Sequence, residues 1–196
     1  MEPGAGPQDA PEAYVAMGAN LGDPLAQLRA AARMLETIGD VVARSSIYAT
    51  VPVGGPQGQA EYLNAVVTLT PRTRDPEAVL DALLAIERRL GRQRSERWGP
   101  RLIDLDLLAF GDAVVGWGEA GVDARGVGPT DAQVGLTLPH PRMAERAFVL
   151  VPLCEVTTRA SARQPAWKHP VTGLGPCEML EALGPTAGVR LTDLRW

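Results

Sequence analysis

The chain has 196 residues, of which 45% are apolar and 21% are charged, and its formal net charge is −4 at pH 7. This composition is typical of a soluble globular domain with a sizeable core, and the acidic balance argues against a general nucleic-acid binder. No stretch reaches the roughly 18 apolar residues of a membrane span. The start of the chain also lacks the basic and apolar parts of a signal peptide.

Residues 1–12 are rich in Gly, Pro and acidic side chains, which predicts a disordered tail before a single domain over 13–196. Two cysteines, Cys154 and Cys177, are too few for a disulfide framework or a four-cysteine metal site. We therefore expect reduced thiols and a cytoplasmic protein.

The first elements are a strand and a helix. An apolar run over 14–18 predicts a buried strand. Asp23 followed by Pro24 is an N-cap with proline in the first helical turn, and helical spacing of apolar residues continues to Ile38, before Gly39. The turn between strand and helix either only redirects the chain or borders a ligand.

Two further strands are predicted over 41–50 and 62–70, joined by a Gly- and Pro-rich loop over 51–59 that is longer than a hairpin turn needs. Asn64 lies within the second of them. Its amide is either exposed at an edge or directed at a ligand, since it offers both a donor and an acceptor to a heterocycle.

A second helix begins at Asp75 and Pro76 and ends at Gly91, with a solvated face expected for Glu87 and its neighbours on the last turn. A strand after it completes the order strand, helix, strand, strand, helix, strand. This order predicts an α+β fold with a ferredoxin-like βαββαβ core, an antiparallel sheet and C-terminal additions.

The last of these strands carries the most informative chemistry. Its alternation places Asp104 and Asp106 on one face, roughly 6.5–7 Å apart, with apolar residues on the other. Flexible carboxylates at that spacing can hold a pair of Mg²⁺ ions. The loop before the strand supplies guanidinium groups suited to phosphate oxygens, on Arg92, Arg94, Arg97 and Arg101. The combination indicates a nucleoside triphosphate site, and the alternative is a surface ion-pair network.

The rest of the chain is less informative. Residues 111–135 are Gly-rich and predict a flexible excursion. His140, between two prolines, is either structural or a phosphate contact. In the last forty residues we expect a short helix near 178–183 and otherwise turns.

Four segments in consistent order between about residues 14 and 153 resemble the 6-hydroxymethyl-7,8-dihydropterin pyrophosphokinases, a family of folate-pathway enzymes. The segments are Met17-Gly18-Ala19-Asn20-Leu21-Gly22, Tyr62-Leu63-Asn64-Ala65, Arg97-Trp98-Gly99-Pro100-Arg101-Leu102-Ile103-Asp104-Leu105-Asp106 and Leu138-Pro139-His140-Pro141. The resemblance implies transfer of pyrophosphate from ATP to the hydroxymethyl group of the pterin, with release of AMP.

The resemblance also implies roles for individual residues. It implies Asp104 and Asp106 as ligands of two Mg²⁺ ions, and Arg92 and Arg101 as catalytic phosphate clamps. The ATP-binding residues that it implies are Glu87, Arg94, Arg97, Leu107, Thr137 and His140. The pterin-side residues that it implies are Thr50, Val53, Tyr62, Asn64, Trp98, Arg146 and Phe148.

Two other functions fit parts of the pattern. One is a different Mg²⁺-dependent phosphoryl or nucleotidyl transferase on the same fold. The other is a non-catalytic module that binds a nucleotide or RNA, which would not need the two aspartates and is disfavoured by the acidic charge. The expected partners are therefore ATP and a pterin, without nucleic acid or membrane, and the sequence names no protein partner.

Overall fold

The computed structural model describes residues 11–54, 56, 58–92, 99–117, 135–160, 166–186 and 188–196. Its helices are α1 (Pro24–Leu35), α2 (Pro76–Arg89), α3 (Ala147–Ala160) and α4 (Pro176–Leu183), with a 3-10 turn, η2, at Met143–Glu145. Its strands are β1 (Ala13–Ala19), β2 (Gly39–Arg44), β3 (Tyr48–Thr50), β4 (Tyr62–Pro71), β5 (Asp104–Phe110) and β6 (Val189–Leu191).

In the described part of the chain, six strands form one sheet in the order β5-β1-β4-β3-β6, and β2 pairs with the far half of β4. The pairs of the central strands are antiparallel. The order matches the expected ferredoxin-like α+β core, with α3, α4 and β6 as the C-terminal additions.

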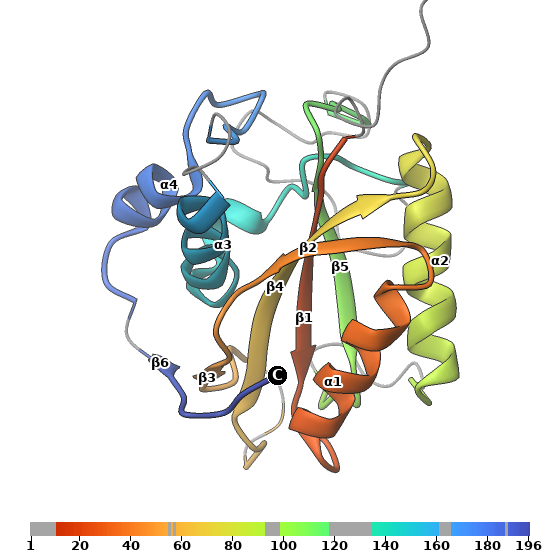
Figure 1. The fold of residues 1–196 in the computed structure, drawn as a ribbon. Helices are drawn as coiled ribbons and strands as arrows, with labels where there is room; N and C mark the ends of the chain where they lie inside the picture. The colour runs from red at the N-terminus through yellow and green to blue at the C-terminus, as the bar shows by residue number, and fades with distance from the viewer. Residues whose placement is uncertain are drawn as a thin grey trace, which may run out of the picture.

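The sheet is covered on both faces (Figure 1). Alternate residues of β1, among them Val15 and Met17, join α1 and α2 in one fully buried cluster. Tyr14 and Val66 point the other way and pack beneath α3 and α4 in a second cluster. Strand alternation therefore produces two cores from one sheet, because successive side chains leave on opposite faces.

The helix starts follow the predicted caps. The side chain of Asp23 accepts a hydrogen bond from Ala26 N at 3.0 Å, and that of Asp75 accepts one from Glu77 N at 2.9 Å. The predicted end of α1 was wrong. The helix ends at Leu35, and Gly39 begins β2, where a Cβ would come within 2.5 Å of the carbonyl oxygen of Thr70.

The predicted strand over 41–50 is two strands, because the chain leaves the ladder at Ser45. Ser45 N still donates to the carbonyl oxygen of Val66 at 2.9 Å, but Val66 N donates to the hydroxyl of Ser45 at 3.0 Å instead of to a main-chain oxygen. Ser46 then donates from both its main chain and its side chain to the carboxylate of Glu155 on α3, at 2.8 and 2.7 Å. This carboxylate also accepts from Tyr48 at 2.9 Å, so α3 holds the start of β3.

The expectation of reduced thiols was also wrong. The structure joins Cys154 and Cys177 in a disulfide between α3 and α4. A cysteine count cannot reveal that two helices pack side by side, and here the packing brings the two Cα atoms to 4.9 Å, within the range of a disulfide.

Other features of the C-terminal third carried weak sequence signals. Helix α3 starts in a continuous apolar run without helical periodicity and contains Pro152. Helix α4 confirms the short helix expected near its residues, whereas β6 replaces one of the expected turns.

Both segments expected to be disordered or flexible fall largely outside the described residues. Of the tail over 1–12, residues 11 and 12 are described, and the carbonyl oxygen of Glu12 accepts a hydrogen bond from Gly111 N at 2.7 Å. Of the excursion over 111–135, the structure describes 111–117 and 135. Within the described ranges, no helix has the length and apolar character needed to cross a membrane.

Candidate active site

The carboxylates of Asp104 and Asp106 leave β5 on the face of the sheet that α3 covers. Between and after them, Leu105 and Leu107 enter the core on the opposite face, as the alternation predicted. On β1, Gly18 is the cross-strand partner of Asp104, and it has no side chain that could cover the carboxylate.

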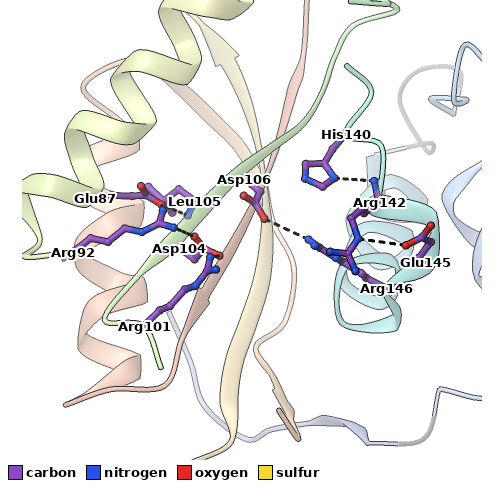
Figure 2. A network of polar contacts seen from close by, with 10 residues as sticks. All are labelled: Glu87, Arg92, Arg101, Asp104, Leu105, Asp106, His140, Arg142, Glu145 and Arg146. Carbon is purple, nitrogen blue, oxygen red and sulfur yellow. Dashed lines mark hydrogen bonds and ion pairs between the residues drawn. The ribbon is translucent and has the colours of Figure 1, made fainter. Parts of the chain in front are cut away.

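Each carboxylate faces arginine. Asp104 pairs with Arg101 and lies 2.8 Å from Nη2 of Arg92, and Asp106 lies 3.8 Å from Nη1 of Arg146. Figure 2 shows Arg92 and Arg101 on one side of Asp106 and Arg146 on the other. The arginines therefore converge on the acidic pair from two separate elements of the chain.

Burial raises the pKa of both aspartates, and repulsion from Asp106 raises the pKa of Asp104 further, against the opposing effect of Arg101 and Arg92. The side chains are 19% exposed for Asp104 and 36% for Asp106. Partial burial next to a second negative charge makes the charged forms dependent on nearby cations.

Glu87, on the last turn of α2, contacts the residues next to the two aspartates. It was expected on a solvated face, but it is only 2% exposed, because the last turn of α2 packs against β5. Its carboxylate accepts a hydrogen bond from Leu105 N at 2.7 Å and pairs with Arg92. Burial raises the pKa of Glu87, and its contacts with Arg92 oppose the rise.

The segment before α3 carries a second group of polar side chains, on His140, Arg142 and Glu145. The main chain of His140 donates to the carbonyl oxygen of Leu108 at 2.7 Å, which fixes this segment to β5. Nδ1 of His140 accepts from Arg142 N at 3.2 Å, so its Nε2 is the nitrogen that carries a proton in the neutral ring. Arg142 also pairs with Glu145 at 3.4 Å, as Figure 2 shows.

A polar pair and two aromatic rings lie farther along the sheet. Asn64 donates from Nδ2 to the hydroxyl of Thr50 at 2.7 Å, and both residues are buried. Tyr62 donates to the carbonyl oxygen of Gly99 at 3.1 Å, and the guanidinium of Arg146 lies 5.8 Å from the ring centre of Phe148.

The turn between β1 and α1 holds the segment that contains Arg101. Oδ1 of Asn20 accepts from Arg101 N at 2.8 Å, and the main-chain N–H groups of Asn20 and Leu21 both donate to the carbonyl oxygen of Arg101. The turn thus does more than redirect the chain, because it sets the position of a residue that contacts Asp104.

These groups open into one cleft of about 750 Å³. Its lining includes the following residues predicted from the sequence: Thr50, Val53, Tyr62, Asn64, Arg92, Arg101, Asp104, Asp106, His140, Arg146 and Phe148. The volume is that of a pocket for a drug-sized ligand.

The chain matches the family described as 7,8-dihydro-6-hydroxymethylpterin-pyrophosphokinase (HPPK) over residues 14–158. It is 36% identical over 183 residues to the 2-amino-4-hydroxy-6-hydroxymethyldihydropteridine pyrophosphokinase of Synechocystis sp., covering 92% of this chain and 80% of the relative. It is 42% identical over 146 residues to the enzyme of that name from Methylorubrum extorquens, covering 74% of this chain and 81% of the relative. The chain belongs to the HPPK family.

Solved structures of HPPK-DHPS proteins share the fold. One, in complex with substrates, superposes with a TM-score of 0.59 at 16% identity and covers 88% of this chain. Another, from Plasmodium falciparum, has a TM-score of 0.62 at 15% identity and also covers 88% of this chain. The chain spans less than half of each of those proteins, 43% and 44%.

Not every residue implied by the resemblance to HPPK lines the cleft. Among the described residues, Glu87 lies beneath it, Leu107 is in the core, and Thr137 is next to a β-bridge between Val115 and Leu138. The positions of Arg94, Arg97 and Trp98 lie outside the described residues, so their HPPK roles stay predictions.

The cleft also includes residues that the sequence did not single out. On the α2 side these are Leu80 and Leu84, and on the α4 side they are Leu183, Pro185, Gly188 and Val189. Leu80 belongs to the apolar stripe of α2, a pattern that usually indicates a core, whereas Leu84 is an exposed apolar residue one turn further along the helix. The α4 group comes from a part of the chain without a recognisable motif.

Proposed function

We propose that the protein transfers the β,γ-pyrophosphoryl unit of ATP to the hydroxymethyl oxygen of 6-hydroxymethyl-7,8-dihydropterin and releases AMP. Membership of the HPPK family supports the reaction class. The observation that carries the proposal is one cleft with two carboxylates, converging arginines and a separate polar pair flanked by aromatic rings.

We further propose that Asp104 and Asp106 hold two Mg²⁺ ions. The residues present fit this role, because both offer hard carboxylate oxygens from one face of β5, and Arg92 and Arg101 hold the carboxylate of Asp104 in a partly buried position. When bound, Mg²⁺ neutralises charge on the phosphate oxygens and orients them.

In this proposal the arginines change partners when ATP binds. Arg92 and Arg101 now neutralise Asp104, and Arg146 lies near Asp106. Guanidinium groups form forked hydrogen bonds with phosphate as readily as with carboxylate, so with cations held by the aspartates, Arg92 and Arg101 would be available to bind the phosphates. His140 donates from Nε2 to a phosphate oxygen, while Arg142 N holds its Nδ1.

The pterin is proposed to bind with its polar edge against Thr50 and Asn64. Their hydrogen bond fixes the amide orientation before the ligand arrives, and both groups retain capacity for further contacts. Tyr62 and Phe148 would flank the flat ring, since aromatic faces favour stacked or tilted rings.

Phosphoryl transfer of this kind depends mainly on positioning and charge neutralisation. The hydroxymethyl oxygen forms a bond to the β-phosphorus and its proton is released. The bond from the β-phosphorus to the oxygen shared with the α-phosphate breaks, and that oxygen leaves with AMP. The cleft would contribute by holding the two substrates in line and by excluding water, which competes as an acceptor.

Phosphorus NMR of the protein with ATP, Mg²⁺ and the pterin tests the reaction. AMP and a pterin diphosphate are expected, and both should be absent without the pterin. ADP would indicate an ordinary kinase instead, and bound ATP without turnover would indicate a binding module.

The Asp104→Asn variant tests the site. It keeps the size of the side chain but removes the charge that Arg92 and Arg101 contact. We expect turnover to fall by roughly 10²–10³-fold or more, the scale reported for loss of one electrostatic contact at a transition state. A variant with wild-type turnover would contradict the proposed metal site.

A further inference from the structure

The segment between the end of α4 and β6, of which residues 183–186 and 188–189 are described, contributes to one end of the cleft. Leu183, Pro185, Gly188 and Val189 all line it. This segment lies beyond residue 158, where the family match ends, and none of the site roles described above involves it.

Val189 continues a row of side chains that the proposed pterin site already uses. On β6 it is the cross-strand partner of Thr50, and Thr50 is in turn the partner of Tyr62 on β4. Cross-strand partners point to the same face of a sheet. The side chain of Val189 therefore lies on the cleft face, directly beside Thr50.

Gly188 fixes the main chain next to this row. Its carbonyl oxygen accepts a hydrogen bond from Val51 N at 3.3 Å, at the start of the 51–54 segment that also lines the cleft. The φ of Gly188 is +90°, a conformation that other residues rarely adopt. The link between β6 and the loop after β3 thus depends on a glycine at this position.

The described residues on both sides of the segment are anchored to the rest of the fold. Beyond β6, Thr192 donates from its main chain and its hydroxyl to the carbonyl oxygen of Ile47, at 3.1 and 2.8 Å. The indole of Trp196 donates to the carbonyl oxygen of Ser45 at 2.7 Å. Before the segment, the disulfide at Cys177 fastens α4 to α3.

From these contacts we infer that Leu183 and Val189 are positioning residues for the pterin. The side chain of Val189 closes the cleft next to Thr50, that of Leu183 lines the cleft from the end of α4, and together they hold the flat ring against the Thr50–Asn64 pair. The inference rests on the proposed function, because it assigns a further part of the same site.

The test uses Leu183→Ala and Val189→Ala in the full chain, with Leu191→Ala as the matched control. Leu191 lies on the same strand and face as Val189, but it is 59% exposed and is not among the residues that line the cleft. Calorimetry measures pterin binding in the presence of Mg²⁺ and a non-hydrolysable ATP analogue, and separately the binding of the analogue alone.

We expect the two cleft variants to bind the pterin roughly three- to tenfold more weakly, the effect of removing a few buried methyl groups. Affinity for the ATP analogue should stay within about twofold of the wild-type value. In steady-state kinetics of the two alanine variants, the KM for the pterin should rise by a similar factor while kcat is maintained. The conservative variant Val189→Ile should keep the wild-type KM.

Unchanged pterin affinity in both variants would overturn the inference. Equal weakening of pterin and ATP, or the same loss in Leu191→Ala, would overturn it as well, since the effect would then be general. Formation of AMP by the wild-type protein tests the proposed function independently. If the wild-type protein binds the pterin but forms no AMP, the proposed reaction is wrong. The pterin affinities of the variants relative to wild type then decide the positioning role by themselves.

Discussion

At the scale of single residues, Glu87 shows how a charged side chain becomes part of the framework. Helical periodicity placed it beside Arg88 and Arg89 on the last turn of α2, where solvent is the usual surrounding. Its burial arises from a contact with β5, and no local pattern carries information about a strand that follows later in the chain.

Removal of this carboxylate should destabilise the protein. Glu87→Ala leaves Leu105 N without its acceptor and Arg92 without one partner, so we expect a loss of about 2 kcal/mol in the free energy of unfolding. Glu87→Gln retains an acceptor and should lose less. Urea unfolding measures both, with the exposed Asp81→Ala on the same helix as the control, expected within about 0.5 kcal/mol of wild type. Equal stability of Glu87→Ala and Asp81→Ala would refute this role.

His169 gives the protein a pH dependence outside the cleft. It is 2% exposed, its Nδ1 accepts from Val171 N and Thr172 N at 3.3 Å, and its ring packs edge-on against Trp117. Burial lowers its pKa below the usual 6.5. The unfolded chain therefore binds a proton more readily than the folded protein does.

The stabilising contribution of neutral His169 is complete above pH 6.5 and decreases as the pH falls from 6.5 towards the lower pKa of the folded protein. Between pH 7.5 and 5.5 the wild type should lose up to about 1.4 kcal/mol more than His169→Asn, which cannot titrate. Urea unfolding at both pH values measures the difference. An NMR titration that gives His169 a pKa at or above 6.5 would contradict the predicted direction of this pH dependence.

At the scale of elements, the sequence predicted what local signals encode. Two Asp-Pro caps placed the starts of α1 and α2, an apolar run placed β1, the stretch 62–70 was predicted as the strand that is β4, and alternation placed β5 with its two faces. The break between β2 and β3 and the strand β6 were not predictable. Both depend on partners far along the chain, such as Glu155 for Ser46 and Thr50 for Val189.

The disulfide is an element-scale feature with a measurable effect. It closes a loop with a sequence separation of 23 residues between α3 and α4. By the loop-entropy relation, Cys177→Ser should lower the free energy of unfolding by about 3 kcal/mol. A reductant should lower the stability of the wild type by a similar amount and leave that of the variant unchanged. Similar stability of oxidised wild type and variant would show that the cross-link adds nothing.

At the scale of the whole molecule, the sequence predicted many of the residues that line the cleft but few of the elements around it. Asp104, Asp106 and the arginines follow from a motif within one stretch, and the resemblance supplied the distant Thr50, Asn64 and Phe148. The part of the cleft lined by Leu183, Pro185, Gly188 and Val189 was not predicted, since apolar residues in a region without periodicity do not indicate a site.

The cleft brings together residues from the first strand to the last, so its ligands should stabilise the entire fold. At a concentration 100-fold above the Kd, a non-hydrolysable ATP analogue with Mg²⁺ should add about 2.7 kcal/mol to the free energy of unfolding. For a domain of this size that is a rise of roughly 5–10 °C in Tm, measurable by calorimetry. The Mg²⁺-dependent part of this rise should be absent in Asp104→Asn; an equal rise in that variant would place the ions elsewhere.

Gly18 has a consequence for the size of the substrate that the site accepts. On β1 it lies between Asp104 of β5 and Asn64 of β4, and a Cβ at this position would come within 3.1 Å of the Asn64 amide oxygen. The acidic end and the amide end of the site are therefore two strand spacings apart, roughly 9.5 Å. That interval is set by main-chain hydrogen bonds rather than by mobile side chains. In the proposed function, the sheet would therefore set a fixed distance between the phosphate-binding and pterin-binding ends of the cleft.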